Sequence, residues 1–386
     1  MAAATRRTTL RVACLALATL VVGEGVARLA DQLLRRDSSL APQPDVSKAL
    51  MVPHPYVGFI PRPDLDASKP GSSLVFTQNS MGFRGPEVQM PKPSGTFRVA
   101  CLGGSTTQAT DTEDDSETWP ARLQAYLQQQ LPEGSPFERV EVINAGAASY
   151  TSMESFVNLK TRLLPLDLDL VVDYDSVNDT QIIKRAGFKP DYSHARRNWT
   201  PPPVPGPLDR WLGWSHLYGT FFIPEKLRRP GRILECVSVE NYYEMPILAL
   251  EQMGPGFETF YWTMREIVGV ARVHGVPAVL CTFAYPKVGK FASNEGNPRD
   301  AYKSVIQRLN EIIRSVAEQD HALLVDLEAS GPSTSLQFLD GIHPNAEGYD
   351  LIARQIAGKL LGTGLLMKAR DRPELPAVLD PTVTGR

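Results

Sequence analysis

The stretch FRVACLGGSTT, residues 97–107, combines an apolar run with a glycine turn that ends in hydroxyl side chains. Its first six residues are mostly apolar, which is typical of a strand covered on both faces of a parallel sheet. Gly103 and Gly104 follow at once, and glycines permit the tight turn that leads from such a strand into a helix. Ser105 is therefore expected at the turn, where its hydroxyl is a candidate nucleophile. A hydroxyl N-cap or a phosphate-binding turn would explain the same residues.

Similar apolar runs recur along the chain, and segments with helical periodicity separate them. The expected strands are FRVACL (97–102), VEVINAG (140–146), LDLVVDY (168–174), PAVLCTF (277–283) and ALLVDL (322–327). The expected helices cover residues 119–131, 155–164, 257–275, 302–319 and 346–361. This alternation predicts an α/β fold, namely a flavodoxin-like three-layer α/β/α sandwich around a five-stranded parallel sheet.

Other segments flank or interrupt the compact domain, which is expected over residues 97–366. Residues 38–96 are rich in proline and polar side chains and are interpreted as a linker that becomes an ordered arm near Asn79–Gly85. Residues 181–256, after the third strand, have no clear period and are interpreted as an inserted lid or substrate platform, with a structural flap as the alternative. Residues 367–386 contain three prolines and are expected to form a tail.

The N-terminal segment, residues 1–37, has the charge order of a secretory signal or a signal anchor. Three arginines precede the apolar run Val12–Gly23. Glu24 ends this run early, although about 20 apolar residues are needed to span a bilayer. Retention as a membrane anchor and cleavage after Ala27 both remain open. The catalytic domain is expected to be extracytoplasmic, on the periplasmic side of the inner membrane, or secreted if the segment is cleaved.

Bulk composition excludes several classes of function. The 386 residues carry a formal net charge of −3, so no basic field favours nucleic acid as a partner. The four cysteines include no Cys-x-x-Cys pair and no Cys/His cluster with zinc spacing, and they are expected to be thiols. No metal and no cofactor is expected, so catalysis would depend on side chains alone.

A serine nucleophile needs a base, and the base needs a third group that fixes its tautomer. His343 lies in the segment LDGIHPN, three residues after Asp340 and just before the last expected helix. The other five histidines lie in loop-like or helix-end contexts. The simpler explanation is that Asp340 and Asn345 are turn and capping residues and that His343 is incidental.

Two more strand ends carry groups suited to acyl chemistry. The second strand ends at Gly146, and the third is followed closely by Asn178. The N–H groups of Ser105 and Gly146 and the side-chain amide of Asn178 would be suitable oxyanion donors, each worth roughly 100- to 1,000-fold in rate. Chain reversal at Gly146 and capping by Asn178 are the simpler explanations.

Taken together, these four blocks resemble the SGNH (GDSL-like) hydrolase family. That family has a Gly-Asp-Ser-like turn, then a glycine, then Gly-x-Asn-Asp, and finally Asp-x-x-His, in this order. The resemblance implies that Ser105 is the nucleophile, His343 the base and Asp340 the residue that orients it. It further implies an oxyanion hole made by Ser105, Gly146 and Asn178.

The resemblance covers about residues 97–180 and 257–362, and two positions depart from it. Gly104 stands where the family motif has aspartate, and Ser176 stands where the third block usually has glycine. Neither departure removes a catalytic group. The Gly-Gly-Ser-Thr turn and the Asn79–Gly85 segment look like those of a membrane-anchored bacterial subgroup.

The resemblance implies ester hydrolysis through an acyl-enzyme and no single substrate class. The expected extracytoplasmic location and the polar arm favour removal of acyl groups, acetyl above all, from an envelope carbohydrate. A lipid esterase or lysophospholipase, or an acyltransferase that uses the same triad, is the alternative. A non-catalytic envelope-binding module is a second alternative, and the intact set of Ser105, Asp340 and His343 argues against it. The expected partners are an acylated small-molecule, glycan or lipid substrate and a membrane. The oligomeric state is left open.

Overall fold

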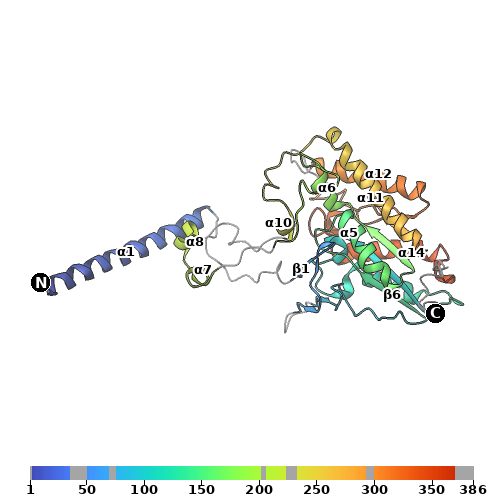
Figure 1. Cartoon of the computed structure of the whole chain (residues 1–386), viewed down its shortest axis with the longest axis horizontal. Helices are drawn as coiled ribbons and strands as arrows, with labels where there is room; N and C mark the ends of the chain where they lie inside the picture. Colours follow the sequence, from blue (N-terminus) through green and yellow to red (C-terminus); the bar gives the residue numbers. More distant parts are fainter. Residues whose placement is uncertain are drawn as a thin grey trace, which may run out of the picture. The chain divides into compact units, whose positions relative to one another are not determined.

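The computed structural model describes residues 2–34, 50–68, 75–200, 206–222, 233–292 and 300–369. The chain divides into two compact units (Figure 1). One unit comprises Met1–Leu50 and Thr200–Cys236, and the other comprises Met51–Trp199 and Val237–Arg386. Most of the expected tail, residues 370–386, lies outside the described residues.

The larger unit is built on a five-stranded parallel sheet. Its strands are β5 (Thr96–Gly103), β6 (Arg139–Asn144), β7 (Leu170–Tyr174), β8 (Ala278–Cys281) and β9 (Leu323–Val325). They lie in the order β6-β5-β7-β8-β9, and every pairing is parallel. This confirms the predicted flavodoxin-like sheet. The strand order reverses between β5 and β7, and open α/β sheets bind ligands at such a point.

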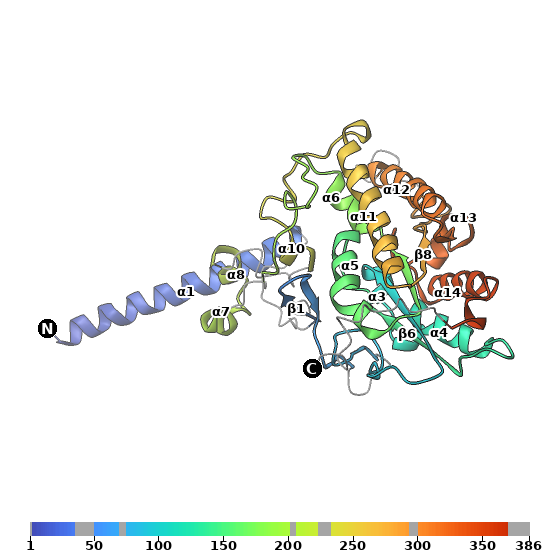
Figure 2. The same cartoon turned by 45° about the vertical axis from the view of Figure 1, so that its right-hand side comes forward.

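Helices cover both faces of this sheet (Figure 2). The flanking helices are α4 (Trp119–Gln129), α5 (Ser152–Asn158), α11 (Gly254–Val273), α12 (Asp300–Gln319) and α14 (Ala346–Leu361). Short helices α3 (Ser105–Gln108), α6 (Val177–Ile183) and α13 (Leu327–Ser330) follow β5, β7 and β9. Local signals fix the starts of two long helices. The Thr118 side chain caps α4 and the Asn345 side chain caps α14.

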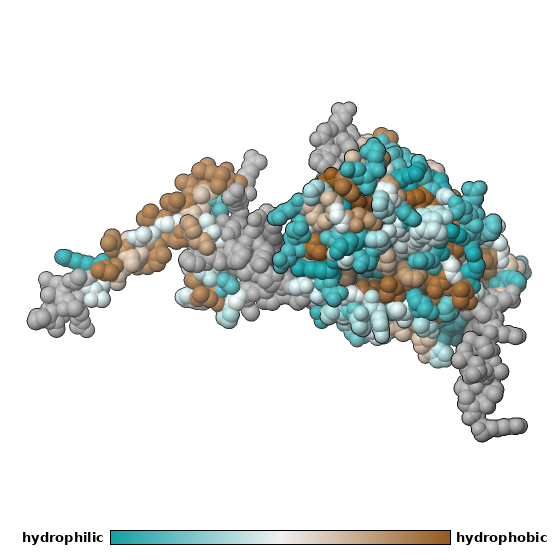
Figure 3. Space-filling view, turned by 45° about the horizontal axis from the view of Figure 1, so that its top comes forward, coloured by the Kyte–Doolittle hydropathy of each residue, from teal (hydrophilic) through white to brown (hydrophobic). Residues whose placement is uncertain are grey.

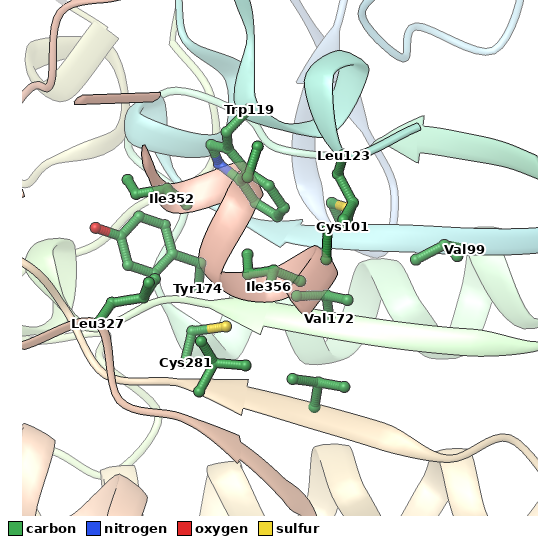
Figure 4. Close-up of a cluster of buried hydrophobic side chains, with 14 of the residues drawn as sticks. Val99, Cys101, Trp119, Leu123, Val172, Tyr174, Cys281, Leu327, Ile352 and Ile356 are labelled. Atoms are coloured by element: carbon green, nitrogen blue, oxygen red, sulfur yellow. The ribbon is translucent and has the colours of Figure 1, made fainter. Parts of the chain in front are cut away.

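Side chains of alternate strand residues enter two separate clusters, because successive residues of a strand point to opposite faces. Val99 and Cys101 pack with side chains of α4 and α14, whereas Ala100 and Leu102 pack with side chains of α11 and α12. Figure 4 shows the first cluster, in which Trp119 lies beside Tyr174. Burial on both faces explains why the strands are apolar throughout.

The arm that precedes the sheet contains two small antiparallel ladders. β1 (Met51–His54) pairs with β2 (Gly58–Pro61), and β3 (Leu65–Asp66) pairs with β4 (Thr77–Gln78). Runs of two to four residues are too short to show a period in the sequence, which is why this region was expected to be irregular before Asn79.

The smaller unit contains the N-terminal helix α1 (Ala2–Leu34) together with α7 (Pro207–Leu212) and α8 (His216–Phe222) from the insertion. Helix α10 (Ile233–Val237) leads back to the larger unit. Residues Thr9–Leu34 of α1 are long and apolar enough to cross a membrane, and a signal sequence would meet the same criteria. The insertion is thus divided between the two units.

Candidate active site

The turn after β5 places Ser105 at the start of α3. Gly103 has φ +147°, and a Cβ there would lie 2.2 Å from Thr107 Oγ1, so no other residue fits. Gly104 then caps α3, and Ser105 is its first residue. The nucleophile candidate therefore stands at the carboxyl end of the central strand, beside the point where strand order reverses.

The three side chains predicted to form the triad lie in a continuous hydrogen-bonded chain. Ser105 Oγ is 2.9 Å from His343 Nε2, and His343 Nδ1 is 2.9 Å from Asp340 Oδ2. The other Asp340 oxygen accepts hydrogen bonds from the backbone N–H groups of Ile342 and His343, each at 2.7 Å. These bonds hold the loop before α14 so that the imidazole faces the serine.

Charge in this loop is arranged to keep the aspartate ionised and the histidine basic. Burial acts to raise the pKa of Asp340, but hydrogen bonds from the His343 side chain and from two backbone N–H groups outweigh it and lower the pKa to about 2. Burial acts to lower the pKa of His343, and the hydrogen bond to Asp340 and the negative charges of Asp111 and Asp340 raise it overall. Such an imidazole is a strong proton acceptor from a hydroxyl.

Asn178, on α6, lies against the nucleophile turn. Its Nδ2 donates to the Tyr150 carbonyl at 2.8 Å, and a Cβ on Gly104 would lie 2.5 Å from the same Nδ2. A Cβ at Gly104 would therefore require the Asn178 side chain to move.

Gly146 also lies beside the nucleophile turn, but its N–H already has an acceptor. A Cβ on Gly146 would lie 2.4 Å from the Gln108 N atom, so this glycine permits close packing against α3. Its N–H donates to Asn144 Oδ1 at 3.2 Å. A role for Gly146 in an oxyanion hole would require it to exchange that bond, and it stays a prediction.

Two residues near the site carry no signal in the sequence. Asp111 Oδ2 lies 4.0 Å from His343 Nε2, and its side chain is 40% exposed. Ser149 has φ +69°, a conformation that favours glycine, and precedes the residue whose carbonyl binds Asn178. Both lie in irregular loops, where neither periodicity nor a motif indicates which side chains turn toward the site.

The ordered arm contributes a buried arginine to the nucleophile helix. Arg84, which is 4% exposed, donates from Nη1 to the carbonyl of Gln108 at 3.0 Å and to that of Ala109. Its Nε binds Asp115 Oδ1 at 2.6 Å. The carbonyls at the C-terminal end of α3 are thereby satisfied by the arm, since a four-residue helix cannot satisfy them itself.

The base of the insertion contacts the loop that follows β6. Arg196 donates to the Ser149 carbonyl and lies 3.4 Å from a Glu154 oxygen. Tyr192 donates its hydroxyl to Asp179 Oδ1 at 2.9 Å. The first residues of the insertion thus contact segments close to the site. A role of the insertion as a lid or platform stays a prediction.

Three buried carboxylates lie on β7 and the residues after it. Asp173, Asp175 and Asp179 are each at most 2% exposed. Burial raises the pKa of Asp179 to about 6, against hydrogen bonds from Ser152 and Tyr192 that act to lower it. Burial and the negative charge of Asp179 also raise the pKa of Asp173, and burial and the negative charges of Asp173 and Asp179 raise the pKa of Asp175.

Comparison with known proteins identifies the chain as an ester hydrolase and shows its family. Residues 101–351 match the model of the GDSL-like Lipase/Acylhydrolase family, and the chain belongs to that family. No curated protein matches the chain.

Several solved structures are similar to it at low identity. Axe2, an acetylxylan esterase from Geobacillus stearothermophilus, is 14% identical, with TM-score 0.42, over 71% of this chain and 97% of its own. The lipase/acylhydrolase from Enterococcus faecalis is 15% identical, with TM-score 0.42, over 72% and 100%. LAE5, an alpha/beta hydrolase enzyme from the metagenome of Lake Arreo, is 17% identical, with TM-score 0.41, over 71% and 97%.

Proposed function

We propose that Ser105 forms an acyl-enzyme with an ester substrate. Ser105 Oγ attacks the carbonyl carbon, His343 accepts the hydroxyl proton, and Asp340 orients the imidazole. The N–H groups of Ser105 and Gly146 and the amide of Asn178 stabilise the oxyanion. His343 then gives this proton to the leaving alkoxide. Water, deprotonated by His343, attacks the acyl carbon, and His343 returns the second proton to Ser105 Oγ as the acid is released. The hydrogen-bonded chain from Ser105 Oγ through His343 to Asp340 is the observation that supports this most directly.

Removal of either reacting side chain tests the proposed triad. We expect Ser105→Ala and His343→Ala each to reduce kcat/KM for a short-chain aryl ester by about 10⁴-fold or more, because triad members act as a unit. Asp340→Ala should reduce kcat/KM by a smaller factor. Labelling by a serine-directed phosphonate should add one adduct to the wild type and none to Ser105→Ala. The exposed His321 provides a control, since His321→Ala should retain activity. Wild-type turnover in Ser105→Ala would remove the proposal.

For the substrate class, we propose an acyl group, in particular acetyl, on an envelope carbohydrate. Asp111 supports this choice over a phospholipid. His343 Nε2 must deliver its proton to the leaving oxygen, and Asp111 Oδ2 lies 4.0 Å from that nitrogen. A hydroxyl next to the ester oxygen of a sugar could donate to this carboxylate, whereas a phosphate in the leaving group would be repelled. An acyltransferase would use the same residues with a sugar hydroxyl in place of water.

Asp111→Asn tests the proposed role of Asp111 beside the leaving group. Because neutral imidazole is the base, a raised pKa moves the acid limb of the kcat/KM profile to higher pH. Asp111→Asn removes one cause of the raised pKa of His343, so the limb should move to lower pH. The ratio of kcat/KM for lysophosphatidylglycerol to kcat/KM for acetylated polysaccharide should also be higher in Asp111→Asn than in the wild type. Glu133→Gln, an exposed carboxylate elsewhere, should change neither result. A steep rise with acyl chain length and no acetate release by the wild type would favour a lipid substrate instead.

We also propose that the chain is anchored by α1, with the larger unit on the periplasmic side of the inner membrane. The arginines before the apolar run support this orientation, since such charges stay on the cytoplasmic side. The expected linker residues from Met51 on belong to the larger unit, so only the short stretch between α1 and β1 connects the anchor to the catalytic unit. Protease added from the periplasmic side should digest the larger unit, and its protection in spheroplasts would contradict this topology.

A further inference from the structure

A segment of the insertion, residues 206–222, binds the N-terminal helix through a polar side chain of that helix. Glu24 accepts hydrogen bonds from Ser215 Oγ at 2.7 Å and from the backbone N–H groups of His216 and Leu217, each at 3.0 Å. The two backbone N–H groups are the first of α8, and a helix cannot satisfy its first N–H groups itself. Glu24, the residue that interrupts the apolar run, therefore caps a helix almost 200 positions away in the sequence.

Further contacts join the same segment to α1 on both sides of Ala27. His216 Nδ1 lies 2.6 Å from Asp31 Oδ2, and Arg28 donates to the Trp214 carbonyl at 3.3 Å. A Cβ on Gly23 would lie 3.1 Å from the Leu217 side chain, so the two elements pack closely there. Cleavage after Ala27 would separate Glu24 from Asp31 and divide this set of contacts. The contacts thus favour retention of α1 in the mature protein.

The depth of these contacts along α1 follows from helix geometry. Thr9 to Gly23 spans about 22 Å at ~1.5 Å per residue, which is short of the ~30 Å hydrocarbon core. Thr9 to Leu34 spans about 39 Å, which is sufficient. In a spanning helix, Glu24 to Asp31 would therefore lie near one membrane surface. Figure 3 shows the hydrophobic side chains along α1 that would face the lipid.

The docked segment itself exposes large hydrophobic side chains. These are Leu208 (58% exposed), Trp211 (73%), Trp214 (65%) and Phe221 (74%). Tryptophan is enriched where a membrane meets water, because its ring is apolar and its N–H is polar. Polar groups on α1 near that surface would be costly without partners, and the segment supplies them.

We propose that residues 206–222, docked on α1, form a membrane-binding element that lies in the head-group region of a phospholipid bilayer. Trp211, Trp214 and Phe221 enter the outer part of the acyl-chain layer, and the pairings of Glu24 and Asp31 satisfy the polar groups of α1 at this depth. The element holds residues 206–222 of the insertion at the membrane surface. This inference rests on the proposed anchoring by α1 and is independent of the proposed substrate.

Tryptophan fluorescence in lipid tests the element directly. The full chain is reconstituted in phosphatidylethanolamine/phosphatidylglycerol vesicles whose acyl chains are brominated near the head group, since bromine quenches only tryptophans in contact with lipid. We expect the wild type to be quenched relative to plain vesicles, and Trp211→Phe/Trp214→Phe to lose most of the quenching. Trp262 is 49% exposed on α11 and serves as the matched control, because Trp262→Phe should retain the quenching. Equal helical circular dichroism of the three proteins checks that each is folded.

Two further measurements separate this inference from the proposed anchoring. Native membranes are washed with alkaline carbonate, and the intact mass of the retained protein is measured. Protein that is washed off, or that lacks α1, would overturn both proposals. Protein that is retained with α1 but shows the same quenching in Trp211→Phe/Trp214→Phe as in the wild type would overturn the element alone. Glu24→Ala should speed amide exchange at residues 215–217, and unchanged exchange would contradict the docking.

Discussion

Ser176 holds a backbone conformation that favours glycine, with φ +125° and ψ −36°. It is 1% exposed, and among the described residues its hydroxyl has no hydrogen-bond partner. Both features cost free energy of folding, about 1–3 kcal/mol for the backbone and a similar amount for the hydroxyl. They explain why the family usually has glycine here. Gly104 is packed closely by Asn178, since a Cβ there would lie 2.5 Å from Asn178 Nδ2.

Ser176→Gly should therefore stabilise the protein. Relief of the strained φ and removal of the unpaired hydroxyl outweigh the extra entropy that glycine gives the unfolded chain, so we expect a gain of about 1–2 kcal/mol. Chemical denaturation of the larger unit would measure it. Ser176→Ala removes the hydroxyl and keeps the strain, so its free energy of unfolding should rise less than that of Ser176→Gly. A lower stability for Ser176→Gly than for the wild type would show that the conformation is not strained.

Among the elements, the arm and the nucleophile helix depend on one another. Helix α3 has only four residues, and Ala109 at its end has φ +55°. Arg84 binds the carbonyls of Gln108 and Ala109 at that end and is itself held by Asp115. We interpret Arg84 as a positioning residue, because a small displacement of α3 would move Ser105 relative to His343.

Arg84→Lys tests this positioning role. Lysine offers a single point charge in place of the planar fork, so it cannot hold both carbonyls and Asp115. We expect kcat for an aryl ester to fall by about 10- to 100-fold while KM changes little, since misplacement of about 1 Å can cost that much. Arg354→Lys is a matched control, because Arg354 is an exposed partner of Asp350 on α14. A change in KM alone would assign Arg84 to substrate binding.

Sequence reasoning succeeded where an element is long and periodic. The runs FRVACL and PAVLCTF are buried strands, as their apolar character indicates, and the segments 302–319 and 346–361 are helices. It missed the hairpin of β1 and β2, which is too short to show a period. It also missed the docking of residues 206–222 on α1, because Glu24 and His216 are far apart in the chain and only tertiary structure pairs them.

The candidate site likewise contains some residues that the sequence indicated and some that it did not. Ser105, Asp340 and His343 were predicted as a triad because four blocks in order resemble the family, and the structure places the three side chains within hydrogen-bond distance; their catalytic role stays a prediction. Asp111 was not singled out, and Arg84 was noted only as part of the Asn79–Gly85 segment, because loops carry no periodic signal that would indicate where their side chains point.

At the scale of the whole molecule, the buried carboxylates determine how stability responds to pH. Asp173, Asp175 and Asp179 have raised pKa values in the fold, and an unfolded aspartate titrates near 3.9. Between that value and the folded pKa, the native state binds more protons than the unfolded state. Stability therefore falls as pH rises through this range. This loss of stability is complete once the pH exceeds the folded pKa, which is about 6 for Asp179.

Asp173→Asn should flatten this dependence. The amide resembles the protonated carboxyl at every pH, so the fall in stability between about pH 4 and pH 7 should be smaller than in the wild type. The histidines are common to both proteins, and the difference between their two melting curves isolates the carboxylate. Asp320 is the matched control. Its pKa is lowered by a hydrogen bond to Arg265, so Asp320→Asn should shift stability by a constant amount across this window. Parallel curves for Asp173→Asn and the wild type would show that Asp173 is ionised in the fold.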